Sequence, residues 1–327
     1  MKNILVTGGA GYIGSHAVRA LIRAGYQISV LDNLSNGFAE FVPKGVKLFK
    51  IDICDPKELD AVFCEREFDA VMHFAGRLEA DLSMMHPEEF FYVNCVGGFN
   101  LLETMRRHGV SKIIFSSSAA VYGEPKSIPI KEESDLKPIN NYGRTKMIFE
   151  QTLEMYRASY GFSYVSLRYF NAAGADPEGG IGERHHPETH LIPNILKAAK
   201  GECDFYLFGT DYETKDGTCI RDYIHVCDLA DAHVLALKYL ENSDVNISRA
   251  EIFNLGNGSG YSNREIIDAA RRVTKSNFKI IKKPRRKGDP SILIADSQKA
   301  EKILGWKRNF TNIDQIIETA WKFELSK

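Results

Sequence analysis

The first half of the chain alternates short apolar runs with amphipathic segments of helical period. The apolar runs predict strands at 3–7, 27–31, 46–51, 69–74, 111–117 and 163–168. The amphipathic segments predict helices at 12–24, 56–65, 88–108 and 142–160. Because strands that alternate with helices pair in parallel and carry the helices on both faces, this pattern predicts a doubly wound parallel α/β sheet over residues 1–170.

The pattern loosens after residue 170. Smaller strand-like and helical units recur there, at 205–208, 251–255, 262–274 and 311–325. We interpret residues 171–327 as a smaller C-terminal α/β region that binds substrate. No clean linker separates it, so we expect the two regions to interleave.

Composition and charge exclude several classes of protein. Among 327 residues, 44% are hydrophobic and 26% charged, and the net charge is −1, so no overall attraction to nucleic acid or to an anionic membrane is expected. No apolar stretch approaches the roughly 20 residues of a membrane helix. The first predicted strand begins at residue 3 and leaves no space for a signal peptide. We therefore expect a cytoplasmic protein.

A glycine-rich turn follows the first predicted strand and precedes the first predicted helix. Gly8, Gly11 and Gly14 have the spacing G-x-x-G-x-x-G. In such a turn the first glycine permits a tight bend, the second lets the backbone approach a pyrophosphate, and the third lets the helix pack closely on the strand. The pyrophosphate then lies at the positive N-terminus of the helix. The pattern predicts a Rossmann-type dinucleotide site.

Acidic residues follow the next two predicted strands. Asp32 ends the second strand, where a carboxylate accepts from both ribose hydroxyls and repels a 2′-phosphate, so NAD is favoured over NADP. Asp52 and Ile53 close the third strand, where a carboxylate could meet an adenine amino group. Ligands of open α/β sheets bind at the C-terminal ends of the strands, so these side chains are expected to line one crevice.

A tyrosine and a lysine, Tyr142 and Lys146, stand four positions apart in a predicted helix, so both lie on one face. Ser118 follows the fifth predicted strand. The ordinary tyrosine pKa of about 10 is too high for a base at neutral pH. A lysine ammonium together with an oxidised nicotinamide ring would supply a positive field that favours the phenolate. Such a pair is usually an ordinary surface pair, and the upstream nucleotide loop makes this one a candidate catalytic pair.

The glycine spacing, Ser118 and Tyr142-x-x-x-Lys146 together resemble the extended short-chain dehydrogenase/reductase family, and the resemblance spans the whole chain. More narrowly, the chain resembles the members that epimerise UDP-hexoses at C4. The segments most specific to that group are 167–171, 216–218, 221–226 and 285–289.

The resemblance implies a reversible interconversion of UDP-galactose and UDP-glucose through a 4-keto sugar, with hydride passing to and from tightly bound NAD. Tyr142 would take the proton of the sugar 4-OH, Ser118 would bond the same oxygen, and Lys146 would lower the Tyr142 pKa. Related dehydratases carry an acid and a base directly after the position of Ser118. Here Ala119 and Ala120 cannot transfer a proton, so elimination of water has no catalyst at this place.

The resemblance also implies which side chains bind ligands. The implied cofactor-binding residues are Gly8, Gly11, Tyr12, Ile13, Gly14, Asp32, Asn33, Asn36, Asp52, Ile53, Phe74, Ala75, Gly76, Asn94, Tyr142, Lys146 and Phe170. The implied substrate-binding residues are Ser118, Tyr142, Asn171, His190, Leu191, Phe208, Arg221, Arg286 and Asp289. The arginines would hold the diphosphate, for which a forked cation is suited, and Asp289 the uridine ribose. A homodimer is also implied, through helices such as 88–108 and 142–160.

Three positions depart from the family's pattern. Leu78 stands where the family often has a cofactor-binding lysine, and Arg77 is a candidate to replace that charge. His190 stands where many members have a substrate-binding asparagine. Leu293 stands at the gate of the sugar pocket and is intermediate in size, which leaves tolerance of N-acetylated sugars open. The alternatives are a UDP-N-acetylhexosamine 4-epimerase, a 4-keto nucleotide-sugar reductase and a catalytically silent NAD-sensing regulator.

Two further clusters of residues could bind nucleic acid or metal. The basic run at 282–287 is followed by Gly288 and Asp289, which favours a diphosphate clamp over a nucleic-acid patch. His185, His186 and His190 lie close in sequence, but Pro187 interrupts them and no carboxylate or cysteine framework is evident. The six cysteines form no C-x-x-C pair. We therefore predict no metal site and no nucleic-acid partner.

Overall fold

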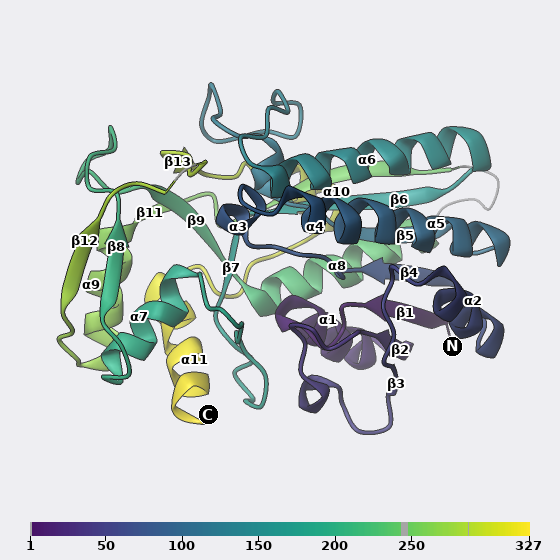
Figure 1. The fold of residues 1–327 in the computed structure, drawn as a ribbon, viewed down its shortest axis with the longest axis horizontal. Coiled ribbons are helices and arrows are strands. Elements are labelled where there is room, and N and C mark those ends of the chain that lie inside the picture. The colour runs from purple at the N-terminus through teal and green to yellow at the C-terminus, as the bar shows by residue number, and fades with distance from the viewer. Residues whose placement is uncertain (1, 243–247, 287) are drawn as a thin grey trace.

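The computed structural model describes residues 2–242, 248–286 and 288–327. Within these ranges, seven parallel strands form a central sheet in the order β10-β6-β5-β4-β1-β2-β3 (Figure 1). The strands are β1 (Asn3–Thr7), β2 (Gln27–Leu31), β3 (Lys47–Phe49), β4 (Ala70–His73), β5 (Lys112–Ser116), β6 (Ser163–Tyr169) and β10 (Ala250–Leu255). The predicted doubly wound sheet is confirmed, and its order reverses between β1 and β4, where a crevice is expected.

The middle of this sheet is apolar on both faces. Ile4, Leu5 and Val6 of β1 have no exposed surface. Ile4 and Val6 pack into one hydrophobic cluster, and Leu5 packs into another on the opposite face. A strand covered on both faces requires a continuous apolar run, which explains why the sequence here does not alternate.

Helices cover both faces of the sheet. One layer consists of α1 (Tyr12–Arg23), α8 (Val226–Glu241) and α10 (Gln298–Leu304). The other layer consists of α2 (Pro56–Glu65), α4 (Pro87–Phe91), α5 (Gly98–Arg107) and α6 (Asn141–Tyr160). The helix predicted at 88–108 contains a π-helical segment, Tyr92–Gly97, between α4 and α5. Short elements are η1 (Ala39–Phe41), α3 (Ala80–Ser83) and η3 (Ala119–Val121).

The remaining elements form the smaller C-terminal region. Its main sheet has the order β11-β9-β13, with β7 paired to β9, and β8 pairs with β12 in a second ladder. Its strands are β7 (Asn171–Ala173), β8 (Phe205–Phe208), β9 (Ile220–His225), β11 (Gly260–Ser262), β12 (Ile280–Lys283) and β13 (Ile292–Leu293). Its helices are α7 (Leu191–Ala199), α9 (Asn263–Thr274) and α11 (Ile313–Leu325), which share one core.

One strand placement predicted from the sequence is wrong. The sequence pattern places the segment 251–255 in the smaller region, but β10 pairs with β6 in the central sheet, from Ala250 opposite Tyr164 to Leu255 opposite Tyr169. Phe253 and Leu255 are fully buried there. The chain therefore leaves the central sheet after β6 and returns to complete its edge, a long-range pairing that local patterns do not reveal.

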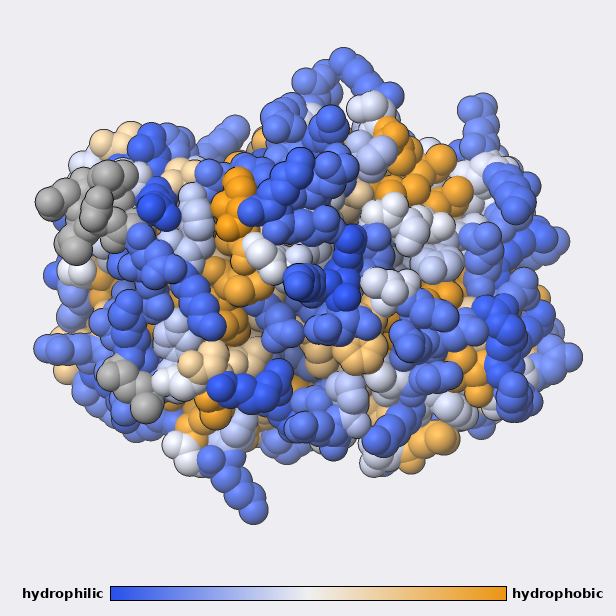
Figure 2. All heavy atoms as spheres, turned by 180° about the vertical axis from the view of Figure 1, so that it is seen from behind, coloured by the Kyte–Doolittle hydropathy of each residue, from blue (hydrophilic) through white to orange (hydrophobic). Residues whose placement is uncertain are grey.

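Hydrophilic side chains cover most of the face that Figure 2 shows. Figure 2 shows that the face opposite to the view of Figure 1 is largely hydrophilic, with hydrophobic side chains in small groups. Among the described residues, no helix combines the length and the apolar character needed to cross a membrane.

Candidate active site

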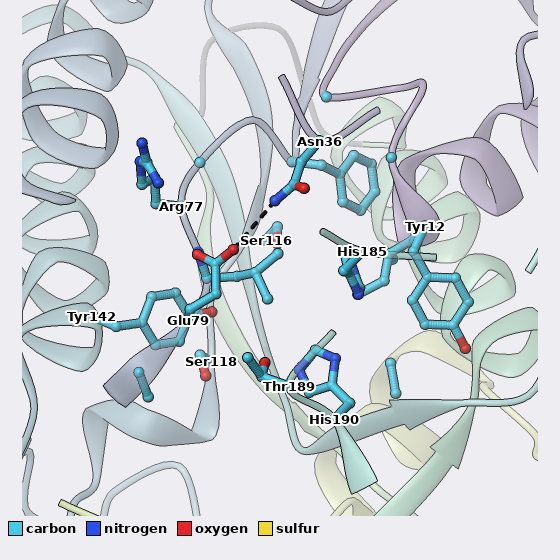
Figure 3. A pocket seen from close by; sticks show the side chains of 18 of the residues that line it. Tyr12, Asn36, Arg77, Glu79, Ser116, Ser118, Tyr142, His185, Thr189 and His190 are labelled. Atoms are coloured by element: carbon cyan, nitrogen blue, oxygen red, sulfur yellow. Dashed lines mark hydrogen bonds between the residues drawn. The ribbon is translucent and has the colours of Figure 1, made fainter. Parts of the chain in front are cut away.

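A cavity of about 640 Å³ opens at the C-terminal ends of the central strands. One wall comes from the ends of β1, β2, β4, β5 and β6 with the loops that follow them. The opposite wall comes from the 183–193 segment, which leads into α7, and Arg286 and Asp289 also line the cavity. Figure 3 shows Tyr142 and Ser118 on one side of this cavity, and His185 and His190 on the other. The cavity therefore joins the two regions of the chain.

The glycine turn between β1 and α1 has the shape that a pyrophosphate requires. Gly8 has φ +71°, and a Cβ there would lie 2.5 Å from the Ala75 nitrogen; a Cβ on Gly14 would lie 2.1 Å from the Gly8 oxygen. A Cβ on Gly11 would meet only the Gly8 oxygen, at 3.3 Å. Gly11 is also the N-cap of α1 and offers no side-chain acceptor. The first-turn N–H groups of α1 are thus available to an anion in the cavity.

Two carboxylates continue the same wall. Asp32 accepts from the backbone N–H groups of Ala10 at 3.0 Å and Leu34 at 2.9 Å, while burial raises its pKa. Asp52 accepts from the Cys54 N–H at 2.8 Å and from Asn33 Nδ2 at 2.9 Å. Burial alone would raise the pKa of Asp52, but these hydrogen bonds lower it on balance. The open Gly11 backbone, the helix N-terminus and the Asp32 carboxylate fit the pyrophosphate and ribose of NAD.

The structure brings Ser118, Tyr142 and Lys146 together. Asn140 caps α6 by accepting from the Gly143 N–H at 2.8 Å, and the Tyr142 N–H donates to Ser83 Oγ at 3.0 Å. The Ser118 hydroxyl lies near the Tyr142 phenol and lowers its pKa. Lys146 Nζ lies 5.7 Å from the Tyr142 ring centre. The start of α6 thereby places the phenol and the ammonium at the cavity wall.

Burial dominates the electrostatics of this group. It raises the pKa of Tyr142 to about 12, an effect that the neighbouring Ser118 hydroxyl opposes and the Glu79 carboxylate reinforces. Burial lowers the pKa of Lys146 to about 8, against the effect of Cys95 and Glu150. The expectation that Lys146, together with an oxidised nicotinamide ring, lowers the pKa of Tyr142 stays a prediction, since Lys146 is not among the groups that shift this pKa in the structure. A phenolate at Tyr142 requires positive charge beyond that of Lys146.

No sequence pattern predicted that Glu79 would face this tyrosine. Its side chain is buried, and Glu79 Oε1 accepts from Asn36 Nδ2 at 3.3 Å (Figure 3). Glu79 adds negative charge to the segment in which Leu78 replaces the family's lysine. Arg77 does not restore the lost charge, because its guanidinium pairs with Glu89 of α4 at 2.7 Å. In the sequence, only the leucine at position 78, in place of the family's lysine, indicated that the charge of this segment is unusual.

Most of the side chains predicted to bind ligands share the cavity wall. They are Gly8, Gly11, Tyr12, Ile13, Gly14, Asp32, Asn33, Asn36, Asp52, Ile53, Phe74, Ala75, Gly76, Ser118, Tyr142, Lys146, Phe170, Asn171, His190, Leu191, Arg286 and Asp289. Lys287, part of the basic run, lies outside the described residues. The grouping spans both regions of the chain, as a site for a dinucleotide and a second ligand requires.

Three predicted side chains lie behind the wall. The amide of Asn94 accepts from the Arg77 N–H at 2.7 Å and donates to the Arg77 carbonyl and to Thr145 Oγ1. Arg221 is buried and pairs with Asp289. Phe208 lies beneath Arg286, whose guanidinium carbon is 4.3 Å from its ring centre. Each of the three supports a neighbour that does line the cavity.

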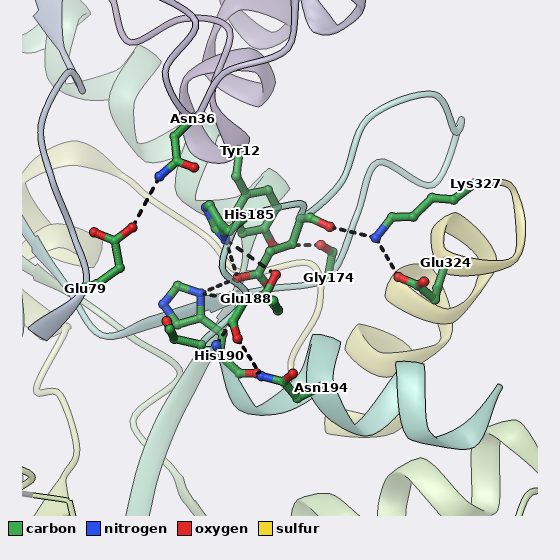
Figure 4. A network of polar contacts seen from close by, with 12 residues as sticks. Tyr12, Asn36, Glu79, Gly174, His185, Glu188, His190, Asn194, Glu324 and Lys327 are labelled. Atoms are coloured by element: carbon green, nitrogen blue, oxygen red, sulfur yellow. Dashed lines mark hydrogen bonds and ion pairs between the residues drawn. The ribbon is translucent and has the colours of Figure 1, made fainter. Parts of the chain in front are cut away.

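A polar cluster occupies the opposite wall. Glu183, His185, Glu188 and His190 converge on one another at the entry to α7 (Figure 4). His190 Nδ1 lies 2.6 Å from Glu183 Oε1. The two glutamates form the carboxylate framework that was not evident in the sequence, because the loop folds back to bring residues 183 and 188 beside the histidines.

The fold and this cavity define an NAD-dependent enzyme, and the chain belongs to the NAD dependent epimerase/dehydratase family, whose model matches residues 4–256. Its sequence is 49% identical to that of the UDP-glucose 4-epimerase of Lacticaseibacillus casei, over 98% of this chain and 96% of that protein. The structure is similar to that of the Bifidobacterium longum UDP-glucose 4-epimerase in complex with NAD+ and UDP (38% identity, TM-score 0.94, covering 99% of this chain and 98% of that one). It is also similar to the UDP-Glc/GlcNAc 4-epimerase of Campylobacter jejuni (40% identity, TM-score 0.85, covering all of both chains).

Proposed function

We propose that the chain is a UDP-glucose 4-epimerase, which interconverts UDP-galactose and UDP-glucose through a 4-keto sugar. The observation that carries the proposal is that Ser118, Tyr142 and Lys146 line one cavity together with Arg286 and Asp289 of the C-terminal region. The family and the full-length similarity to UDP-glucose 4-epimerases support the same reaction.

The residues of the first wall are suited to hold NAD. The α1 N-terminus and Gly11 would receive the pyrophosphate, Asp32 the adenosine ribose, and Asp52 with Ile53 the adenine. NAD, when bound, supplies the acceptor and donor of the C4 hydride. Lys146 would hold the nicotinamide ribose, and its ammonium adds to the positive field that Tyr142 needs.

Tyr142 is the group that would move the proton of the sugar 4-OH. Its phenol faces the cavity from the first turn of α6, and the neighbouring Ser118, which lines the same cavity, would bond the same sugar oxygen. The neighbouring Ala119 and Ala120 carry no acid or base, so the site lacks a catalyst for elimination at this position. Proton removal and return at O4 is the chemistry that remains.

The second wall would anchor the UDP group and leave the sugar free to turn. Arg286 offers a forked cation for the diphosphate, and Asp289, held by Arg221, offers an acceptor for the uridine ribose. Epimerisation requires the 4-keto sugar to present its other face after hydride removal. Binding energy from the non-reacting nucleotide lets the sugar be held without fixing one face.

The test is product analysis by chromatography after incubation of purified protein with UDP-galactose and no added cofactor. We expect UDP-glucose to accumulate, and the Tyr142→Phe variant to form little product. A failure to convert UDP-galactose even with NAD supplied would overturn the proposal. Loss of reduced-nicotinamide absorbance in step with turnover of a 4-keto nucleotide sugar would identify a reductase instead.

A wider substrate range is the second candidate, and the position of Leu293 favours it. Leu293 is buried in a cluster with Ala119 and Phe170 and does not line the cavity wall. No bulky side chain therefore enters the cavity from this position. Incubation with UDP-N-acetylgalactosamine tests the idea: wild-type turnover supports it, and it should fall selectively in Leu293→Tyr. Conversion of UDP-galactose alone would restrict the enzyme to unmodified hexoses.

We further propose that the chain forms a homodimer through α4, α5 and α6. Large apolar side chains are exposed on these helices at Phe91, Phe99, Met155 and Tyr160. Exposed apolar groups gathered on neighbouring helices are typical of association surfaces. Light scattering coupled to size-exclusion chromatography should give twice the chain mass, and Phe99→Glu should give a monomer. A monomeric wild-type protein at micromolar concentration would contradict the proposal.

A further inference from the structure

The cluster of Glu183, His185, Glu188 and His190, here called the 183–190 tetrad, has the composition of a metal site. One side-chain ligand atom from each residue lies within 4.8 Å of the other three. The tetrad sits on the loop between β7 and α7 (Figure 4), and its histidines, His185 and His190, lie across the cavity from Tyr142 (Figure 3). Two imidazoles and two carboxylates are a ligand set typical of divalent transition metals.

One nitrogen of the tetrad is buried without a close polar partner. Glu183 and His185 are each only 7% exposed, and His185 Nδ1 has no hydrogen-bond partner. Its nearest charged neighbours are the carboxylates of Glu183 and Glu188, each 3.6 Å away. Glu183 Oε1 differs, because it lies 2.6 Å from His190 Nδ1. Buried polar atoms are almost always satisfied, so the unpartnered His185 Nδ1 between two carboxylates indicates a missing partner.

Three of the separations within the tetrad fit ligands of a shared ion better than they fit hydrogen bonds, and the fourth, 2.6 Å between His190 Nδ1 and Glu183 Oε1, would have to lengthen when an ion binds. His185 Nδ1 is 3.6 Å from both Glu183 Oε1 and Glu188 Oε2, and His190 Nδ1 is 3.6 Å from Glu188 Oε1. Hydrogen bonds of this kind are about 2.7–3.2 Å long. Two ligands that bind zinc at about 2.0–2.1 Å with a tetrahedral angle lie about 3.4 Å apart. Small movements of the side chains would therefore close the site.

Capping and ion pairing explain only part of the tetrad. Glu188 Oε1 accepts from the His190 N–H at 3.0 Å, at the start of α7, and His190 Nδ1 pairs with Glu183 Oε1. These contacts give a role to His190 and to one oxygen of each glutamate. They leave His185 Nδ1 facing two carboxylates at a distance too long for a hydrogen bond.

We propose that the 183–190 tetrad binds one divalent transition-metal ion, with Zn²⁺ as the best match to its two nitrogen and two oxygen ligands. The His185 ring lies edge-on to Tyr12, 6.3 Å between centres, and His190 is the N-cap of α7. The ion would thus connect the residues that pack against the glycine turn, through Tyr12, to the start of α7. The four protein ligands complete a tetrahedron, so the role is structural rather than catalytic.

The test begins with the full-length protein, stripped with a chelator and dialysed. Titration with ZnCl₂ by calorimetry and elemental analysis after desalting should show one ion per chain. Zinc should also raise the melting temperature. Glu183→Gln and His185→Gln should each weaken zinc binding by tenfold or more, and X-ray absorption should report mixed nitrogen and oxygen ligands without sulfur.

A matched control uses another group of potential ligands in the described part of the chain, Asp60, Cys64 and His108, which lies at the surface. His108→Gln should retain the bound ion. His190→Asn removes a ligand but keeps a polar side chain at the α7 N-cap, so it tests zinc binding even if the other variants do not fold. The proposal would be overturned if the wild-type protein bound no stoichiometric zinc. It would also be overturned if His108→Gln lost zinc while His185→Gln and His190→Asn retained it.

Discussion

The guanidinium of Arg168 and the carboxylate of Glu150 form a two-pronged ion pair beneath the active-site helix. Nε lies 2.9 Å from Oε1 and Nη2 lies 2.6 Å from Oε2. Both side chains are almost fully buried, and Ser117 Oγ donates to the same carboxylate. Because Glu150 stands one turn after Lys146 on α6, the pair fixes the helix that carries Tyr142 and Lys146 to strand β6.

Removing one member of this pair should destabilise the fold strongly. Arg168→Met leaves the Glu150 carboxylate buried without its cation, and we expect a loss of about 3–5 kcal/mol in the free energy of unfolding. The double variant Arg168→Met/Glu150→Leu should recover most of that loss, because it removes the second charge as well. Urea denaturation at pH 7 measures both values. A single variant as stable as the wild type would contradict the prediction.

Tyr142→Phe should abolish turnover while leaving the fold intact. The change removes the hydroxyl that would exchange the proton with O4, and we expect kcat to fall by about 10²–10⁴. Tyr156→Phe is the matched control, because it makes the same change on the same helix, where the hydroxyl donates to Glu103 at 2.5 Å. Steady-state kinetics with UDP-galactose and calorimetry with UDP separate chemistry from binding. Equal losses of kcat in both variants would refute the assignment.

Glu79→Gln should shift the pH dependence of the reaction to lower pH. The Glu79 carboxylate raises the pKa of Tyr142, so its removal should lower that pKa. Activity that depends on the phenolate rises with pH, and the midpoint of that rise in kcat/KM should move down by up to about one pH unit. Glu89→Gln, which removes the partner of Arg77 on α4, serves as the control. An unchanged or upward-shifted midpoint in Glu79→Gln would rule this out.

Acid should destabilise the protein through His225. Its Nδ1 accepts from the Cys227 N–H at the start of α8, so Nε2 carries the proton toward Thr319 Oγ1 at 3.0 Å. Burial lowers the pKa of His225 to about 3. The unfolded chain takes up a proton near pH 6.5 and the folded protein does not, so stability is lost as pH falls from about 6.5 toward 3.

Asparagine at this position can keep the cap without titrating. Between pH 6.5 and 5 we expect the wild type to lose about 2 kcal/mol more of unfolding free energy than His225→Asn. Urea titrations at the two pH values give this difference directly, with His86→Asn, at an exposed site, as the control. Parallel losses in wild type and His225→Asn would show that His225 does not carry the effect.

Local patterns predicted the parts of the molecule that depend on neighbours in sequence. The continuous apolar run of β1, the glycine turn and the Tyr142–Lys146 pair all follow from spacing and period. The return of β10 to the central sheet could not be predicted, because nothing local specifies which edge a strand joins. The buried Glu79 and the two glutamates of the tetrad were missed for the same reason. Their neighbours are set by how loops fold back.

The pairing of β10 with β6 delays completion of the central sheet while the chain is being synthesised. A chain growing from its N-terminus has synthesised six strands of the central sheet by residue 169, but the edge of β6 stays unpaired until residue 255 is available. During that interval β6 offers open backbone groups and apolar side chains to other chains. The nascent protein therefore passes through a stage that is prone to aggregation, and slow translation between β6 and β10 would lengthen its need for chaperones.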